Sequence, residues 1–363
     1  MSAEKLNIAE ELKVVGEYQA FPFFGGPPMT SPKYNTPITP KENFDRFMKG
    51  EKPLWQPNGL DFVTLVPRVV PDNVARAFVF DAEPLDSLKE GGGIDWFGVE
   101  WEYVPKVNGS MVRPGAPLKV PNVAEWEKYI TFPNLDEMDW EGSAEKNNKF
   151  LAGDRVKIVW VMNGLYERLI SFMEFENAAI ALVDEDMKAG VHRLFDALAN
   201  FYDEVFEKIK KYYDADTIYF HDDWGSQRSP FFSIRTVREM LVPYLKRICD
   251  SAHKRDMYLD LHSCGKVEKL VPAMIEAGVD IWSGQIMNDK LAVAKEYGDK
   301  IKVSVAPLVD RRTATPEEVF EATKELMETY GPVLNSVLIS AGMGGSPATY
   351  EYIYTKTREE FAK

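Results

Sequence analysis

The sequence MYLDLHSCG, residues 257–265, is the best guide to the fold, because an apolar run in it ends abruptly in a polar turn. The first part has the character of a buried strand, which ends at His262-Ser263-Cys264-Gly265. Residues i and i+2 of a strand point to the same side, so His262 and Cys264 can converge on one metal ion, and zinc accepts this nitrogen and sulfur pair. The same residues also fit an ordinary helix start with Ser263 or Cys264 as N-cap. Both interpretations stay open.

Strand and helix patterns alternate on both sides of this stretch. Seven segments have the character of buried strands, namely residues 61–66, 156–161, 217–220, 258–261, 280–283, 302–306 and 336–339. Helical patterns lie between most of them, at residues 165–172, 177–187, 188–212, 234–255, 267–277, 290–297, 316–330 and 347–361. Such alternation indicates parallel strands, and one more strand within residues 68–153 would complete eight. We therefore predict an α/β fold of the (β/α)₈ TIM-barrel type, with an open doubly wound sheet as the alternative.

The first third of the chain is less regular. Residues 1–38 are rich in proline and phenylalanine, and we expect a largely irregular N-terminal arm there. Order begins at Thr39-Pro40-Lys41-Glu42, which has the N-cap, the first-turn proline and the glutamate of a capped helix. Residues 39–363 are expected to form a single barrel domain. Within it, residues 68–153 are interpreted as a small β-rich insertion or cap.

Charge and cysteine content limit the partners and the location. The formal net charge of the 363 residues is -14 at pH 7. A surface for nucleic acid or an anionic membrane needs clustered Lys and Arg, so we expect small molecules and proteins as partners. The sequence has no secretory signal and no transmembrane run, and its two cysteines, Cys249 and Cys264, do not form a disulfide framework. These features predict a soluble, cytoplasmic protein.

Polar residues follow most of the predicted strands, and the carboxyl ends of barrel strands carry the active site. His221-Asp222-Asp223 follows the strand at 217–220. Adjacent acids beside an imidazole raise one another's pKa values where buried, which suits proton transfer. We expect catalytic roles for these three residues, with a structural hydrogen-bond network as the alternative. The candidates for substrate binding at this and other strand ends are Trp160, Asn163, Trp224, Gln227, Gln285 and Met343.

The combined pattern resembles the uroporphyrinogen decarboxylase superfamily. The resemblance rests on the segments 221–227, 229–230, 243–244, 262–265 and 276–280. In addition, residues 39–44 and 49–53 look like the usual first helix of that superfamily. The resemblance extends over residues 39–361 and implies a (β/α)₈ barrel.

The decarboxylases of this superfamily carry an Arg-Gln-Ala-Gly-Arg loop near the N-terminus that holds the carboxylates of the substrate. Phe21 to Pro28 stands near that place in this chain and contains no arginine. A polyanionic tetrapyrrole would lack its counter-charges there. Decarboxylation of such a substrate is therefore disfavoured.

The other branch contains cobamide-dependent methyltransferases that bind zinc through a His-x-Cys pair and a distant cysteine. His262 and Cys264 match the pair, but Met343 stands where the distant cysteine is expected. A thioether is a weak ligand for zinc. The resemblance leaves two outcomes, either no bound zinc or a zinc site completed by another group such as His221, Asp222 or Asp223.

The resemblance implies an anaerobic O-demethylase component. Such a methyltransferase takes a methyl group from a small methoxylated substrate and passes it to the Co(I) corrinoid, a cobalamin, of a partner protein. Aromatic residues near strand ends and the cap could stack on an aromatic donor; they are Trp96, Phe97, Trp101, Trp160, Trp224 and Trp282. The alternatives are a decarboxylase of a small organic acid and a non-catalytic binding barrel. A homodimer is left open.

Overall fold

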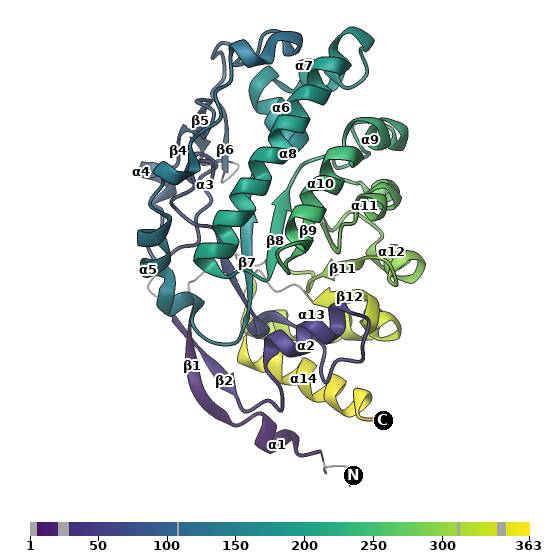
Figure 1. The fold of residues 1–363 in the computed structure, drawn as a ribbon. Helices are drawn as coiled ribbons and strands as arrows, with labels where there is room; N and C mark the ends of the chain where they lie inside the picture. The colour runs from purple at the N-terminus through teal and green to yellow at the C-terminus, as the bar shows by residue number, and fades with distance from the viewer. Residues whose placement is uncertain (1–5, 21–28, 107–108, 311–312, 340–345) are drawn as a thin grey trace. The chain divides into compact units, whose positions relative to one another are not determined.

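The structure is a computed structural model that describes residues 6–20, 29–106, 109–310, 313–339 and 346–363 (Figure 1). It divides into two compact units. The first comprises Met1–Val63, Asn148–Lys157 and Asp289–Lys363. The second comprises Thr64–Asn147 and Ile158–Asn288.

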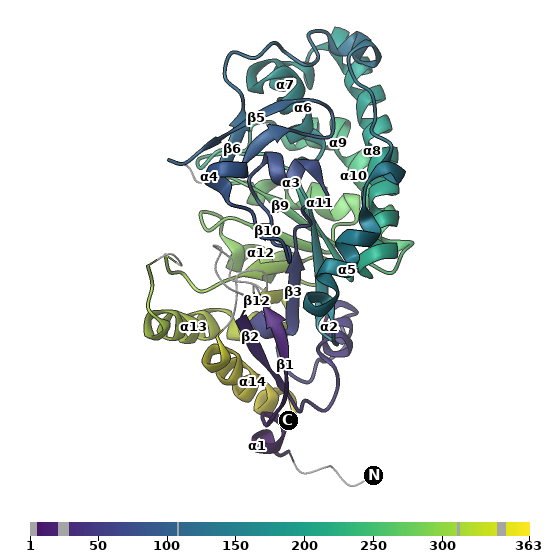
Figure 2. The same ribbon diagram turned by 90° about the vertical axis from the view of Figure 1, so that its left-hand side faces the viewer.

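The second unit is built on parallel strands. The strands β7 (Val156–Val161), β8 (Thr217–His221), β9 (Tyr258–Ser263) and β10 (Ile281–Gly284) are neighbours in that order. The helices that alternate with them are α6 (Leu165–Met173), α7 (Phe175–Ala181), α8 (Glu185–Tyr213), α9 (Ile234–Met240), α10 (Val242–His253) and α11 (Val271–Ala277). Figures 1 and 2 show α8 running beside α10, which it contacts. This order places the carboxyl ends of β7 to β10 at one edge.

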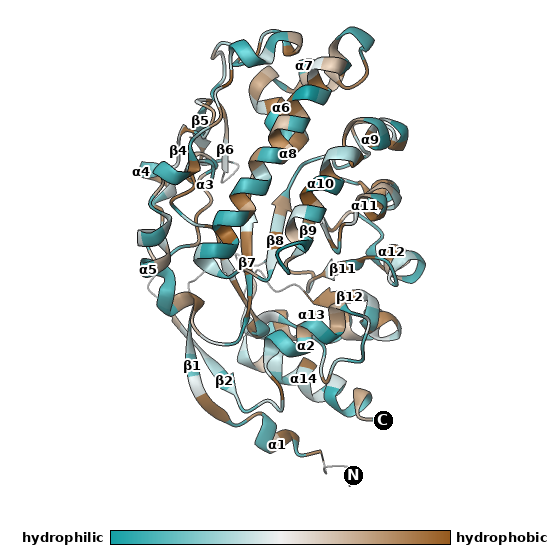
Figure 3. Ribbon diagram, viewed as in Figure 1, coloured by the Kyte–Doolittle hydropathy of each residue, from teal (hydrophilic) through white to brown (hydrophobic). Residues whose placement is uncertain are grey.

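Helix α8 has the amphipathic pattern expected of a helix that covers a sheet. Hydrophobic and hydrophilic residues alternate along its ribbon (Figure 3). The apolar residues that give residues 188–212 their helical pattern are all buried, namely Val191, Leu194, Phe195, Leu198, Phe201, Tyr202, Val205 and Ile209. Asp184 caps its first turn by accepting a hydrogen bond from the backbone N–H of Asp186.

An antiparallel sheet interrupts the α/β series between residues 68 and 153. The strands β4 (Gly92–Ile94), β5 (Glu100–Val104) and β6 (Gly109–Val112) pair in that order. The short helices α3 (Pro71–Ala75) and α4 (Ser87–Glu90) precede them, and α5 (Trp140–Leu151) follows. The predicted β-rich character is thus confirmed. In the described part of this region no strand joins the parallel series, so the eighth strand expected there is not found.

The first unit contains the strand β11 (Lys302–Val305), which pairs in parallel with β12 (Val337–Ile339). Its helices are α1 (Ile8–Glu11), α2 (Pro40–Met48), α12 (Lys290–Tyr297), α13 (Pro316–Tyr330) and α14 (Pro347–Phe361). A capping box opens α2, with Thr39 and Glu42 bonded to each other's backbone as predicted. Trp55, Tyr350 and Tyr354 form a buried aromatic cluster in this unit.

The N-terminal arm differs from the expectation. Strand β1 (Val14–Ala20) pairs antiparallel with β2 (Met29–Tyr34). The largely irregular course predicted for residues 1–38 is therefore wrong for these two segments. Pro32 lies opposite Glu17, which is a position that proline tolerates because each strand of a two-stranded sheet is an edge strand.

Seven strands, β3 (Phe62–Leu65) and β7 to β12, alternate with helices along the described chain. This series confirms the predicted α/β fold of the TIM-barrel type. None of the described helices is long and apolar enough to cross a membrane. The division into an arm and one barrel domain stays a prediction.

Candidate metal centre

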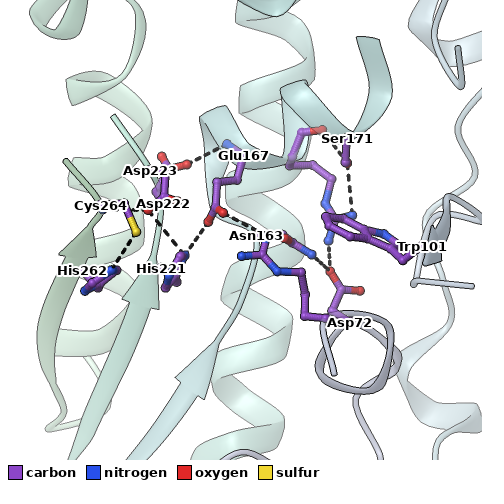
Figure 4. A network of polar contacts seen from close by, with 12 residues as sticks. Asp72, Trp101, Asn163, Glu167, Ser171, His221, Asp222, Asp223, His262 and Cys264 are labelled. Atoms are coloured by element: carbon purple, nitrogen blue, oxygen red, sulfur yellow. Dashed lines mark hydrogen bonds and ion pairs between the residues drawn. The ribbon is translucent and has the colours of Figure 1, made fainter. Parts of the chain in front are cut away.

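Two histidines meet at the carboxyl ends of β8 and β9 (Figure 4). The parallel register places His221 directly opposite His262. Their rings stack with centroids 4.5 Å apart and an angle of 27° between the planes. Cys264 follows two residues after His262, just beyond the strand. The strand pairing thus brings the segment after β8 together with the His262-Cys264 pair.

Asp223 completes a cluster of four groups that could hold a metal ion. One ligand atom from each of Asp223, His221, His262 and Cys264 lies within 4.8 Å of the others. Nε2 of His262 lies 3.4 Å from Sγ of Cys264, and Oδ1 of Asp223 accepts a hydrogen bond of 2.7 Å from the backbone N–H of Cys264. The donor set of nitrogen, sulfur and carboxylate oxygen is one that zinc accepts.

The turn after β9 holds Cys264 in place. The side-chain amide of Gln285 donates to Sγ of Cys264 at 3.2 Å, and its oxygen accepts from the backbone N–H of Gly265 at 2.8 Å. Gly265 has a φ of +93°, and a Cβ there would lie 2.3 Å from the backbone of Gly225. Only glycine fits both the backbone angle and the space.

The electrostatic setting of the cluster favours a bound cation. Burial and the neighbouring Asp223 raise the pKa of the Cys264 thiol well above its ordinary value. Burial, followed by repulsion from Glu167, raises the pKa of the Asp223 carboxyl. The charged forms of the Cys264 thiol and the Asp223 carboxyl are therefore disfavoured. A bound metal ion would stabilise the thiolate and the carboxylate.

Glu167 holds His221 from the first turn of α6. Its Oε2 lies 2.6 Å from Nδ1 of His221, and its Oε1 accepts a hydrogen bond of 2.9 Å from Nη1 of Arg76. Burial raises the pKa of Glu167, but the charges of His221 and Arg76 outweigh it and lower this pKa to about 2. Glu167 is therefore an anion that orients an imidazole.

Arg76 is fixed at the end of α3. The next residue, Ala77, has a φ of +55°, and the backbone N–H of Phe78 bonds to the carbonyl of Asn73 at 2.8 Å, which closes the helix. Nη1 of Arg76 also donates to Oδ1 of Asn163 at 2.8 Å, and the guanidinium lies over the ring of Trp101 at 5.2 Å from its centroid.

A second buried ion-pair network is connected to Arg76 through Asn163. The guanidinium of Arg168 donates to Asp72 and to Asp95, the latter at 2.6 Å. Asp72 also accepts from the side-chain amide of Asn163 at 2.6 Å. These groups are almost fully buried, and the charges compensate one another. The network fixes the orientation of Asn163 and, through it, of Arg76.

The predicted site residues fall into different environments. Asp222 turns away from the cluster and accepts from the backbone N–H of Glu167 and from Nε1 of Trp224, both at 2.8 Å. Trp224 is buried, whereas Gln227 is exposed. Trp160 is partly exposed and stacks on Tyr219 at a centroid distance of 4.1 Å. Gln285 contacts Cys264 as described, and Met343 lies outside the described residues.

Sequence reasoning missed Glu167 and Arg76. Glu167 lies in the first turn of the helix that follows Asn163-Gly164 at the end of β7. Such a turn begins at the active-site edge of a barrel, so its acidic residue could have been considered. Arg76 belongs to the irregular region after β3, where no local pattern marked it.

Comparisons with known proteins were consistent with this fold. Residues 169–349 match the family model of uroporphyrinogen decarboxylase. The chain is similar to a methyltransferase from Methanosarcina mazei, with 15% identity, 90% of this chain and 100% of that chain covered, and a TM-score of 0.57. A sugar phosphate isomerase/epimerase from Parabacteroides distasonis matches with 8% identity over 65% of this chain and 82% of its own, with a TM-score of 0.34. The likeness to the methyltransferase shows the fold. No curated protein matches.

Proposed function

Because the chain belongs to the uroporphyrinogen decarboxylase superfamily, we propose that it is a methyltransferase of that superfamily. It takes the methyl group from a small methoxylated aromatic substrate and delivers it to the Co(I) corrinoid of a partner protein. The observation that carries this proposal is the convergence of His221, Asp223, His262 and Cys264 at the carboxyl ends of two barrel strands. The structural likeness to a methyltransferase supports the choice of reaction.

A zinc ion fits the cluster. His262, Cys264 and Asp223 would hold it with one nitrogen, one sulfur and one oxygen, and three protein ligands are the usual number at a catalytic zinc. When bound, zinc would act as a Lewis acid toward the ether oxygen. Asp223 thus takes the place of the distant cysteine that the sequence lacks.

His221 is the proton donor in this proposal. When the methyl group leaves, the electron pair of the carbon–oxygen bond stays on the oxygen, which then needs a proton. Glu167 holds Nδ1 of His221 at 2.6 Å and so orients the ring beside the cluster. We propose that Asp222 positions the start of α6, because its carboxylate bonds to Glu167 and Trp224, whereas the sequence predicts a catalytic role for it.

The first test is metal content. Protein purified without added metal is analysed by mass spectrometry of the elements, together with the variants His262→Ala and Cys264→Ala. We expect on the order of one zinc per chain in the wild type and none in the two variants. Cys249→Ala is the matched control, because Cys249 is buried in α10 and its loss should leave zinc unchanged.

The second test is methyl transfer to free cob(I)alamin, followed by its absorbance change with a series of methoxyarenes. We expect turnover in the wild type and none in His262→Ala or Cys264→Ala. A wild type that holds no zinc and demethylates none of the methoxyarenes would refute the proposal. Release of CO₂ from a small organic acid by the protein alone would favour the decarboxylase alternative.

A further inference from the structure

Arg76 has one hydrogen-bonding edge occupied and one available. Nη1 donates to both Glu167 and Asn163, at 2.9 Å and 2.8 Å. Among the residues that the structure describes, neither Nε nor Nη2 of Arg76 has a hydrogen-bond partner. The side chain is 18% exposed, so this Nε and Nη2 edge is within reach of a ligand.

The available edge has a fixed direction. Trp101 covers one face of the guanidinium, and Glu167 and Asn163 hold Nη1. The left-handed conformation of Ala77 ends helix α3 at Arg76 and so fixes the position of the Arg76 backbone, from which the side chain extends. A guanidinium held on one face and one edge loses little freedom when its second edge binds a ligand. The Nε and Nη2 pair is the side-on fork that binds a carboxylate with two parallel hydrogen bonds.

Arg76 lies close to the metal cluster. It and His221 bond to the two oxygens of the same carboxylate, that of Glu167. The guanidinium also acts electrostatically on Asp223 and Cys264. A ligand bound to the outer edge of Arg76 therefore lies in the neighbourhood of the cluster.

A row of stacked aromatic rings ends at His262 of the cluster. Phe78, two residues after Arg76, stacks on Trp160 at a centroid distance of 5.0 Å. Trp160 stacks on Tyr219 at 4.1 Å, and Tyr219 stacks on His262 at 5.7 Å. All four rings are partly exposed. Rings stacked in this way present their edges, and the face of a further aromatic ring can pack on such edges.

We propose that the Nε and Nη2 edge of Arg76 binds a carboxylate of the methyl donor, which is a methoxylated aromatic acid. The carboxylate lies on Arg76, the aromatic ring packs along the row of Phe78, Trp160 and Tyr219, and the methoxy group reaches the cluster. This inference deepens the proposed function and rests on it for the reaction. The binding of an aromatic acid can be measured without the reaction.

The test compares 4-methoxybenzoate with its neutral isostere 4-methoxybenzamide, by calorimetry on the zinc-loaded protein without corrinoid. We expect the acid to bind at least roughly tenfold more tightly, the scale of one charge-assisted hydrogen bond. Arg76→Met should remove this preference, and Arg76→Lys should keep part of it, because lysine has a charge but no fork. Arg113→Met is the control, since Arg113 is exposed and pairs with Glu100 at 2.6 Å.

The outcomes separate the two proposals. Equal affinity for the acid and the amide in the wild type overturns the role of Arg76, whether or not Arg76→Met folds. An unchanged preference in a folded Arg76→Met or Arg76→Lys variant also overturns it. Selective acid binding without methyl transfer to cob(I)alamin upholds the carboxylate site and refutes the proposed reaction. Methyl transfer with equal use of acid and amide upholds the reaction and refutes the carboxylate site.

Discussion

Oε2 of Glu167 lies 2.6 Å from Nδ1 of His221, so a carboxylate from helix α6 orients the imidazole at the end of strand β8. Glu167→Gln keeps the shape of the side chain and removes its charge. We expect turnover to fall by about 10–100-fold, the usual effect of removing a carboxylate that orients a histidine at a metal site. The measurement is methyl transfer to cob(I)alamin, with zinc content and thermal unfolding recorded in parallel.

The control for this variant is Glu276→Gln, because Glu276 is exposed and pairs with Arg238 at 2.6 Å. It should leave turnover unchanged. A Glu167→Gln enzyme with wild-type turnover and wild-type zinc content would show that the contact with His221 is structural only.

Gly265 carries two separate constraints, and a matched pair of variants resolves them. Its φ is +93°, and a Cβ would lie 2.3 Å from the backbone of Gly225, whereas Gly93 has a φ of +97° and open space. Gly93→Ala should cost about 1–2 kcal/mol for the left-handed backbone alone. Gly265→Ala should cost about 1–3 kcal/mol more because of overpacking, and it should displace Cys264 and lower the zinc content. Unfolding by denaturant measures both costs, and equal costs would contradict the packing argument.

Local patterns in the sequence account for most of the barrel elements. The apolar spacing of residues 188–212 and the capping box at Thr39 follow from contacts within one helix, and both are present. The sequence does not predict the pairing of β1 with β2, because proline is unfavourable in most regular structure. Pro32 nevertheless fits an edge strand, since the outer side of such a strand needs no N–H donor.

The candidate site was predictable only where one strand or one turn defines it. His262 and Cys264 are two residues apart, and His221 comes beside them through the parallel register. Glu167 and Arg76 are 91 residues apart in sequence and meet through the tertiary fold. The spacing of apolar residues in the sequence does not indicate such a long-range pair. In the sequence alone, an acidic residue or an arginine at the site looks the same as one on the surface.

Asp222 tests the difference between a catalytic and a positioning role. Its carboxylate accepts from the backbone N–H of Glu167 and from Nε1 of Trp224, both at 2.8 Å. Asp222→Asn turns one acceptor into a donor against a buried N–H, so we expect a loss of about 1–3 kcal/mol of unfolding free energy. Zinc content should stay unchanged, whereas Asp223→Asn should lose zinc. An Asp222→Asn variant with full stability and lost turnover would support the catalytic role that the sequence predicts for Asp222.

We predict that the contact of His253 with Asp280 makes the stability of the second unit depend on pH. Nε2 of His253 lies 2.7 Å from Oδ2 of Asp280. The hydrogen bond to Asp280 raises the pKa of His253, partial burial opposes it, and the charges of Asp250 and Lys246 act in opposite directions.

A histidine whose pKa is raised on folding contributes stability below its unfolded pKa of about 6.5, and this contribution is lost as the pH rises through the folded pKa. His253→Gln removes the titration and keeps an amide. The unfolding free energy of the wild type should therefore exceed that of His253→Gln at pH 6, and the difference should shrink steadily toward pH 9. His192→Gln is the control, because Nδ1 of His192 faces the neutral hydroxyl of Tyr244 at 2.9 Å. If the difference for His253→Gln is the same at pH 6 and pH 9, the ion pair with Asp280 does not contribute to stability and the contact is an ordinary hydrogen bond.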